Sequence, residues 1–146
     1  HHGHDVAQAK DGMDVAFCTI DFSTLQLEYA GAYNPLYIVR DGKLMETKGD
    51  KFPIGLFLGK EKKKFVNHTF QLKRGDCVYI FSDGYADQFG GPKGKKFMIS
   101  HFRNLLLQIS DETIDQQKYI LAKTLQDWCG HLDQVDDILV LGVKIE

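Results

Sequence analysis

Alternating apolar and polar positions in the first half of the chain predict β-strands. Residues 25–30 alternate strictly, with Leu25, Leu27 and Tyr29 on one face, as expected for a half-buried strand. Residues 14–22 carry apolar side chains on both faces, which predicts a strand buried on both sides.

A hairpin and a central strand follow from the same pattern. Asp41-Gly42 stands between the β-rich runs 36–40 and 43–47, and this dipeptide favours a type I′ turn because both of its central residues need a positive φ. Residues 77–81 form a continuous apolar run, which is typical of a strand in the middle of a sheet.

The hydrophobic period changes in the second half. Apolar residues recur at steps of three and four over 99–109 and again over 114–128, which predicts two amphipathic helices. The apolar residues of 138–145 predict a final buried strand. Residues 48–63 are expected to form a packed loop, and 65–72 a further strand.

A run of strands, then two helices, then one returning strand predicts an α+β layered fold. The length of 146 residues suits one domain. The aromatic residues are expected in its core: Phe17, Phe22, Tyr29, Phe81, Phe102 and Trp128.

Composition removes several classes of function. The chain has 18 Lys and Arg against 20 Asp and Glu, a net charge of −2, so we expect no nucleic-acid partner. Its longest apolar run, 138–143, is too short to cross a bilayer, and we expect no direct membrane contact. Cys18, Cys77 and Cys129 are widely spaced, which predicts buried reduced thiols and a cytoplasmic location.

The first ten residues differ from the rest. His1, His2 and His4 surround a single glycine, so residues 1–10 are interpreted as a purification-tag remnant or an upstream linker. The same composition suggests that the chain is a fragment of a longer protein.

Two acidic motifs carry the candidate chemistry. Ser82-Asp83-Gly84 directly follows the predicted central strand, and Asp136-Asp137 directly precedes the last one. If those strands are neighbours, the carboxylates converge at one edge of the sheet. Clustered carboxylates suit Mg²⁺ or Mn²⁺, and two such ions about 3.5–4 Å apart activate water for attack on phosphorus. Taken singly, each motif is also a common turn or a solvated loop.

Two other readings are weaker. Ser82 with His68, His101 or His131 would form a hydrolase triad, but the chain lacks a G-x-S-x-G elbow. Residues 90–97 are expected to be a flexible basic loop, whose lysines Lys93, Lys95 and Lys96 are solvated or contact a phosphoprotein.

The segments FSDGYADQFGG (81–91) and QVDDILVLGV (134–143) resemble the bacterial SpoIIE-type branch of the metal-dependent protein serine/threonine phosphatases, the PPM family. Residues 11–44, 52–55 and 72–76 also resemble this branch. The resemblance implies an antiparallel β-sandwich flanked by helices, with two Mn²⁺ or Mg²⁺ ions at one end.

The resemblance also implies roles for particular residues. Asp83 and Asp136 match metal-binding aspartates of the family, and Asp137 occupies the neighbouring, less certain position. Gly84 permits the tight turn beside the metal site. Asp87 falls where relatives often carry an acidic residue, with a structural role expected.

The chain departs from the family in one respect. The family's first half carries an Asp-x-x-Gly-His-Gly-like run that supplies the bridging ligand, and Gly3-His4-Asp5 only partly resembles it. Either the chain starts after that aspartate, so that residues 11–146 are the C-terminal portion of a phosphatase domain incomplete at its N-terminus, or the metal site is naturally degenerate.

The resemblance therefore leaves two functions open. One is a phosphatase of bacterial signal transduction, which hydrolyses phosphoserine or phosphothreonine on a protein such as an anti-sigma factor antagonist, under control of an upstream sensor domain. The other is a non-catalytic binding or scaffold module of the same fold. The open sheet edges of an incomplete domain would also favour a homodimer.

Overall fold

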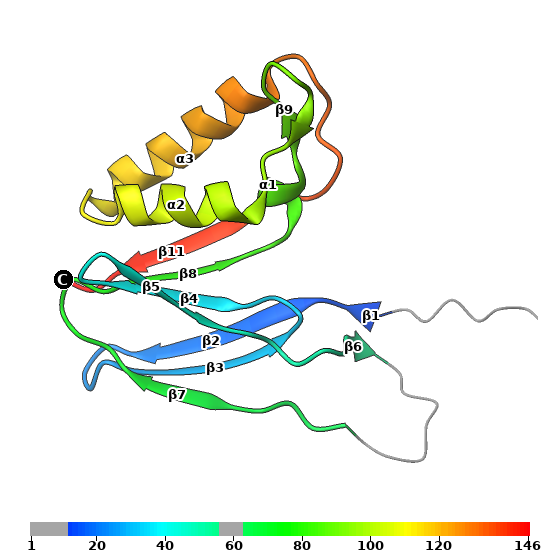
Figure 1. Ribbon diagram of the computed structural model, residues 1–146. Helices are drawn as coiled ribbons and strands as arrows, with labels where there is room; N and C mark the ends of the chain where they lie inside the picture. Colours follow the sequence, from blue (N-terminus) through cyan, green and yellow to red (C-terminus); the bar gives the residue numbers. More distant parts are fainter. Residues whose placement is uncertain (1–11, 56–62) are drawn as a thin grey trace, which may run out of the picture.

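A computed structural model describes residues 12–55 and 63–146, and in it two antiparallel sheets form a sandwich with helices on one side (Figure 1). One sheet has the strand order β2-β3-β7 and the other the order β11-β8-β4-β5. Their strands are β2 Val15–Asp21, β3 Gln26–Ala32, β4 Leu36–Arg40, β5 Lys43–Thr47, β7 His68–Gln71, β8 Cys77–Phe81 and β11 Val140–Lys144.

The remaining elements are short strand pairs and three helices. β1 Gly12–Met13 pairs with β6 Ile54–Gly55, and β9 Phe89–Gly90 pairs with β10 Lys95–Lys96. The helices are α1 Gly84–Asp87, α2 Ile99–Ile109 and α3 Ile114–Cys129. The α+β sandwich predicted from the order of elements is therefore confirmed.

Local signals in the sequence are also confirmed. Asp41 and Gly42 have φ values of 49° and 73° between β4 and β5, as a type I′ turn requires. β8 lies between β4 and β11, so it is the interior strand that its apolar run predicted. The structure adds a helix cap to these features: the side chain of Thr113 accepts a hydrogen bond from the Gln116 amide and caps α3.

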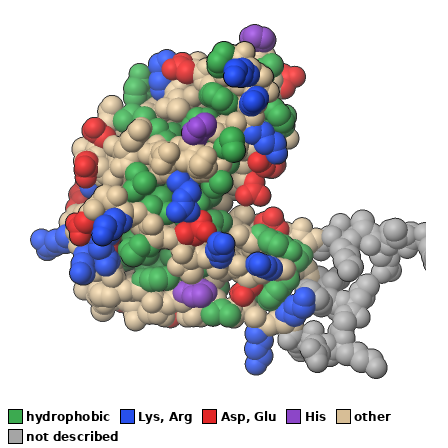
Figure 2. All heavy atoms as spheres, in the orientation of Figure 1, with side chains coloured by type: hydrophobic (Ala, Val, Ile, Leu, Met, Phe, Trp, Pro, Cys, Tyr) green, Lys and Arg blue, Asp and Glu red, His purple; other side chains and the backbone are tan. Residues whose placement is uncertain are grey.

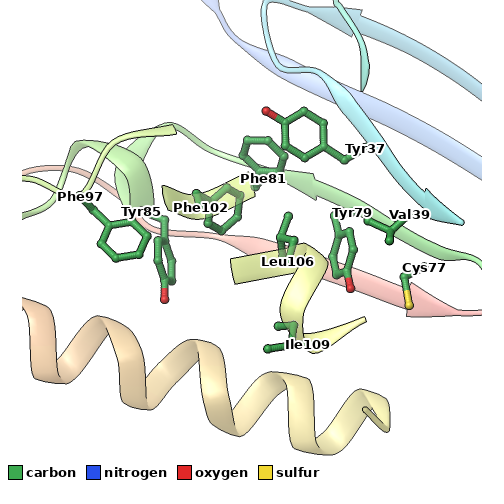
Figure 3. Packing of buried hydrophobic residues seen from close by; sticks show 10 residues of the cluster. All are labelled: Tyr37, Val39, Cys77, Tyr79, Phe81, Tyr85, Phe97, Phe102, Leu106 and Ile109. Carbon is green, nitrogen blue, oxygen red and sulfur yellow. The ribbon is translucent and has the colours of Figure 1, made fainter. Parts of the chain in front are cut away.

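The sandwich contains two hydrophobic cores. The first lies between the sheets and includes Leu27, Tyr29, Leu36, Ile38, Leu72 and Val78. The second lies between the β11-β8-β4-β5 sheet and the helices and includes Tyr37, Tyr79, Phe81, Tyr85, Phe102 and Leu106 (Figure 3). This second core ends at Phe81 and Tyr85, which flank the Ser82-Asp83-Gly84 turn.

Helix α3 is joined to this core by buried polar contacts. The Tyr79 hydroxyl donates to Oε1 of Gln117 at 2.6 Å, and the Tyr85 hydroxyl donates to the carbonyl oxygen of Leu121 at 2.7 Å. Figure 3 shows both hydroxyls pointing towards α3. Gln117 is 1% exposed, so the amide is satisfied inside the protein rather than by water.

An ion pair closes the end of the sandwich away from the acidic motifs. Arg40 donates from Nε and Nη2 to both carboxylate oxygens of Asp76, at 2.8 and 2.6 Å, and Asp76 is fully buried. Burial alone raises the pKa of Asp76, but the hydrogen bonds from Arg40 and from the Lys73 amide outweigh it and leave this pKa lowered.

Three expectations about burial are wrong. Phe17 is 66% exposed because it lies on the face of β2 that does not pack against the other sheet, and Phe22, just beyond β2, is 67% exposed. The last strand is shorter than predicted: Leu139 precedes it and is 56% exposed, and Leu141 is 52% exposed because β11 is an edge strand. Of the three free cysteines only Cys77 is buried; the other two are half-buried.

Residues 90–97 are not the loop that was expected. They contribute to the β9–β10 hairpin, whose backbone is hydrogen-bonded to the rest of the fold. Part of the predicted packed loop 48–63, and residues 1–10, lie outside the described residues. Of the helices that the structure describes, none has the length and apolar character needed to cross a bilayer.

Candidate metal centre

The two acidic motifs meet because β8 and β11 are antiparallel neighbours. Val140, at the start of β11, pairs with Phe81, at the end of β8. The residues that follow β8 therefore lie beside those that precede β11. The Ser82 amide continues the pairing by donating to the carbonyl oxygen of Leu139 at 3.0 Å.

The Ser82 side chain joins the motifs more tightly. Its hydroxyl donates to the carbonyl oxygen of Asp137 at 2.8 Å and accepts from the Leu139 amide at 3.0 Å. These bonds hold the acidic segment against the turn after β8. They also commit the Ser82 hydroxyl to backbone partners, which gives no support to a triad with a histidine.

Gly84 is required by close packing between the same segments. A Cβ atom at this position would lie 2.1 Å from the carbonyl oxygen of Asp137 and 2.9 Å from Cγ1 of Ile138. Any larger residue would push the Asp136-Asp137 segment away from the turn. Gly84 therefore permits the approach of the two acidic motifs.

Three other carboxylates influence the ionisation of Asp83. Asp83 lies exposed at the surface, yet partial burial of its carboxyl raises its pKa, and the negative charges of Asp87, Asp14 and Asp136 raise it further. Acidic side chains gather at this corner of the surface, below β9 in the view of Figure 2. Bound cations relieve this kind of repulsion between carboxylates.

The predicted site residues Asp136, Asp137 and Asp87 make different contacts at this corner. Oδ1 of Asp136 accepts a hydrogen bond from the Asp137 amide at 2.7 Å, and the negative charge of Asp136 raises the pKa of Asp83. Asp137 contributes its backbone carbonyl to the contact with Ser82, while its side chain is exposed. Asp87 lies one helical turn beyond Asp83. Its backbone amide donates a hydrogen bond to the carbonyl oxygen of Asp83 at 3.0 Å.

Asp14 was not recognised as a site residue from the sequence. It lies between β1 and β2, and its pattern in the sequence is that of a lead-in to a strand. Only the tertiary structure brings its charge to Asp83. The pattern of apolar and polar residues could not indicate this proximity, because Asp14 and Asp83 are far apart in the chain.

The donor set fits a hard divalent cation in part. Asp83 and Asp136 offer carboxylate oxygens, which Mg²⁺ and Mn²⁺ prefer. Within residues 12–55 and 63–146, however, no three His, Cys, Asp or Glu side chains are placed to hold one metal ion. Mg²⁺ commonly keeps several waters and takes one or two carboxylates, so aspartates are the right type of ligand here but a centre of two ions needs more of them.

The antiparallel sandwich and its helices match the fold of the PP2C-type phosphatase domains. The family described as Stage II sporulation protein E (SpoIIE) matches residues 3–146, and the chain belongs to this family. A search of curated proteins found no match.

Solved structures support the same assignment. The SiaA-PP2C domain of Pseudomonas aeruginosa has a TM-score of 0.81 and 29% identity, over 91% of this chain and 52% of that one. The phosphatase domain of the cell fate determinant SpoIIE from Bacillus subtilis, in a structure described as Mn presoaked, has a TM-score of 0.62 and 17% identity, over 91% and 56%. The RsbU and RsbW domains of Rv1364c from Mycobacterium tuberculosis have a TM-score of 0.66 and 20% identity, over 88% and 35%. The chain thus spans about half the length of the first two.

Proposed function

We propose that residues 11–146 are the C-terminal portion of a metal-dependent protein serine/threonine phosphatase domain, with Asp83 and Asp136 as metal ligands. One observation carries this proposal. The Ser82 hydroxyl and the close approach at Gly84 hold two acidic motifs, 53 residues apart in the chain (136 − 83), at one corner of the sheet. Membership of the SpoIIE family supports the same chemistry.

The residues at this corner have separate tasks in the proposed enzyme. Asp83 and Asp136 bind Mn²⁺ or Mg²⁺, and Asp137 takes the neighbouring position with its carbonyl held by Ser82. When bound, such ions supply Lewis-acid activation of water and of the phosphoryl group. Asp14 and Asp87 add negative charge that favours cation binding.

The substrate in this proposal is a phosphoserine or phosphothreonine on a bacterial regulatory protein such as an anti-sigma factor antagonist. One relative of this fold occurs with a fragment of a regulatory domain, and another with an RsbW domain. We infer that this chain likewise acts in cytoplasmic signal transduction, with an upstream regulatory domain in its parent protein, and that it assembles as a homodimer.

A non-catalytic binding module is the second candidate. The observation in its favour is that the described residues place no three metal-binding side chains together. Under this hypothesis the fold binds a partner protein through its surface, and the acidic corner does not catalyse a reaction. The upstream sequence discriminates the two, because the phosphatase reading requires a further aspartate there.

The experiment is Mn²⁺-dependent hydrolysis of an aryl phosphate, measured on this chain and on a version extended upstream to the full length of the relatives. We expect turnover only in the longer protein, because two aspartates do not hold two ions. Absence of turnover in both proteins would refute the phosphatase proposal and favour the binding module.

Substitutions in the longer protein test the ligand assignment. Asp83→Asn and Asp136→Asn should each lower turnover by about 100-fold or more, since a lost ligand removes several kcal/mol of transition-state stabilisation. Asp111→Asn, an exposed aspartate after α2, is the matched control. Unchanged turnover in Asp83→Asn would overturn the assignment.

A further inference from the structure

The β9–β10 hairpin follows the acidic corner directly and is held rigidly beside it. The Gly91 amide donates to the carbonyl oxygen of Trp128 at 2.8 Å, and Nε1 of Trp128 donates to the carbonyl oxygen of Gln88 at 2.9 Å. The Phe97 amide donates to the same Gln88 oxygen at 2.9 Å. A Cβ atom on Gly90 would lie 2.0 Å from the Trp128 oxygen, so the hairpin packs directly on the end of α3.

This rigid hairpin presents positive charge beside negative charge. Lys93, Lys95 and Lys96 are all exposed on it. Nζ of Lys96 lies 3.4 Å from Oδ1 of Asp87. The negative charge of Asp87 also raises the pKa of Asp83. In Figure 2, basic side chains gather over the region of β9, with acidic side chains just below them. Lys96 therefore links the hairpin to the acidic residues around Asp83, and Lys93 and Lys95 stand exposed on the same short hairpin.

Exposed apolar side chains border the hairpin at both of its ends. Phe89 is 38% exposed at its start, and Met98 and Ile99 are 55% and 46% exposed just beyond its end. Met98 has φ 80° and ψ 145°, a conformation that residues other than glycine rarely adopt and that costs roughly 1–3 kcal/mol. Hydrogen bonds from the Met98 amide to Ala86 and from Phe102 to Met98 hold it there.

We propose that the β9–β10 hairpin is the docking surface for the protein substrate, and that it selects acidic residues next to the phosphorylated side chain. This inference rests on the proposed function, which puts the phosphate at Asp83 and Asp136. Lys93 and Lys95 then contact the flanking acidic residues, and the bordering Phe89 supplies apolar contact. Mixed basic and apolar composition of this kind is typical of protein interfaces, and complementary charge gives such interfaces their specificity.

The test is binding, so it does not depend on turnover. The probes are two synthetic phosphoserine peptides, one with glutamates and one with glutamines on both sides of the phosphoserine. Fluorescence anisotropy with the 146-residue chain in 50 mM salt should give at least about fivefold tighter binding of the glutamate peptide, and the difference should shrink in 500 mM salt.

Charge reversal locates the contact. Lys93→Glu/Lys95→Glu should abolish the preference for the glutamate peptide, and Lys93→Gln/Lys95→Gln should reduce it. Lys43→Glu/Lys118→Glu changes the same charge at exposed positions on β5 and α3 and should leave the preference intact. Amide shifts in NMR spectra of each variant check that the fold is retained.

Equal binding of the two peptides, or equal loss in the control variant, would overturn the docking proposal. Its failure is separable from that of the proposed function. Turnover of an aryl phosphate without a glutamate preference refutes docking alone, whereas a glutamate preference without turnover in the extended protein refutes the phosphatase alone.

Discussion

The hydroxyl of Ser82 lies 2.8 Å from the carbonyl oxygen of Asp137 and donates a hydrogen bond to it, across 55 residues of sequence. The same hydroxyl accepts from the Leu139 amide. One small polar side chain thus fixes the position of the acidic segment relative to the turn after β8. The geometry of the candidate metal centre depends on this contact.

Replacement of Ser82 by alanine should loosen the acidic segment. Two hydrogen bonds are lost, and we expect the free energy of unfolding to fall by about 1–2 kcal/mol. Hydrogen exchange at the Leu139 amide should accelerate, because its acceptor is gone. Ser100→Ala, at an exposed position on α2, is the control and should leave this amide protected. Unchanged exchange at Leu139 in Ser82→Ala would contradict the structural role.

Gly84→Ala tests the close approach of the two motifs. The new methyl group overlaps the carbonyl oxygen of Asp137, and such overpacking costs about 1–3 kcal/mol. We also expect Mn²⁺ affinity in the extended protein to fall at least about tenfold, because the aspartates move apart. The measurements are urea denaturation and a Mn²⁺ titration by electron paramagnetic resonance.

Gly42→Ala is the matched control for that variant. Unlike Gly84, Gly42 has a positive φ, and a Cβ atom there meets nothing within 4 Å. It should therefore show the conformational cost of alanine and no loss of Mn²⁺ affinity. Equal Mn²⁺ affinity in the two variants would show that the contact between Gly84 and Asp137 does not control the site.

The Arg40–Asp76 pair should make stability depend on pH. Because the pKa of Asp76 in the folded protein is lowered from the ordinary 3.8, the pair stabilises the fold above that value. This contribution is lost as the pH falls through the lowered folded-state pKa. Arg40→Met should cost about 3 kcal/mol at pH 7, since it leaves a buried carboxylate without its partner.

Urea denaturation at pH 7, 5 and 3 measures this dependence. The difference between the original protein and Arg40→Met should narrow towards pH 3, because burial raises the pKa of an Asp76 that has lost Arg40, and protonation then removes the unpaired buried charge. Lys123→Met, which breaks the exposed pair with Asp127, is the control and should change stability little at any of these pH values. A difference that stays constant with pH would contradict the assignment.

Tyr79→Phe tests the polar attachment of α3. The substitution removes the donor to Oε1 of Gln117 and leaves a buried amide oxygen unsatisfied, which costs about 1–3 kcal/mol. Thermal denaturation measures the loss. Tyr119→Phe, at a position 61% exposed on the same helix, should have almost no effect. Equal melting temperatures for all three proteins would refute the importance of this bond.

Much of the fold was predictable because its signals are local. The turn at Asp41-Gly42 follows from the φ values that the dipeptide accepts. The interior position of β8 was indicated by its continuous apolar composition. Such features need only a few neighbouring residues.

The errors share a different cause. Phe17 and Leu141 are as apolar as core residues, yet both are exposed because their strands lie at sheet edges or turn one face outwards. The β9–β10 hairpin has a glycine- and lysine-rich sequence that suggests a loop, and it is ordered by contacts with Trp128. Pairing with distant segments decides these outcomes.

The sequence by itself determined the two long helices, the β4–β5 hairpin, the interior strand β8, the α+β class and the two acidic motifs that carry the family resemblance, since each depends on short stretches of residues. Only the tertiary structure decided that β8 and β11 are neighbours, that Ser82 joins the motifs, and that Asp14 adds its charge to Asp83. The physical reason is that electrostatic and hydrogen-bonding partners are chosen by proximity in space, and proximity between residues far apart in the chain arises only when the whole sandwich packs.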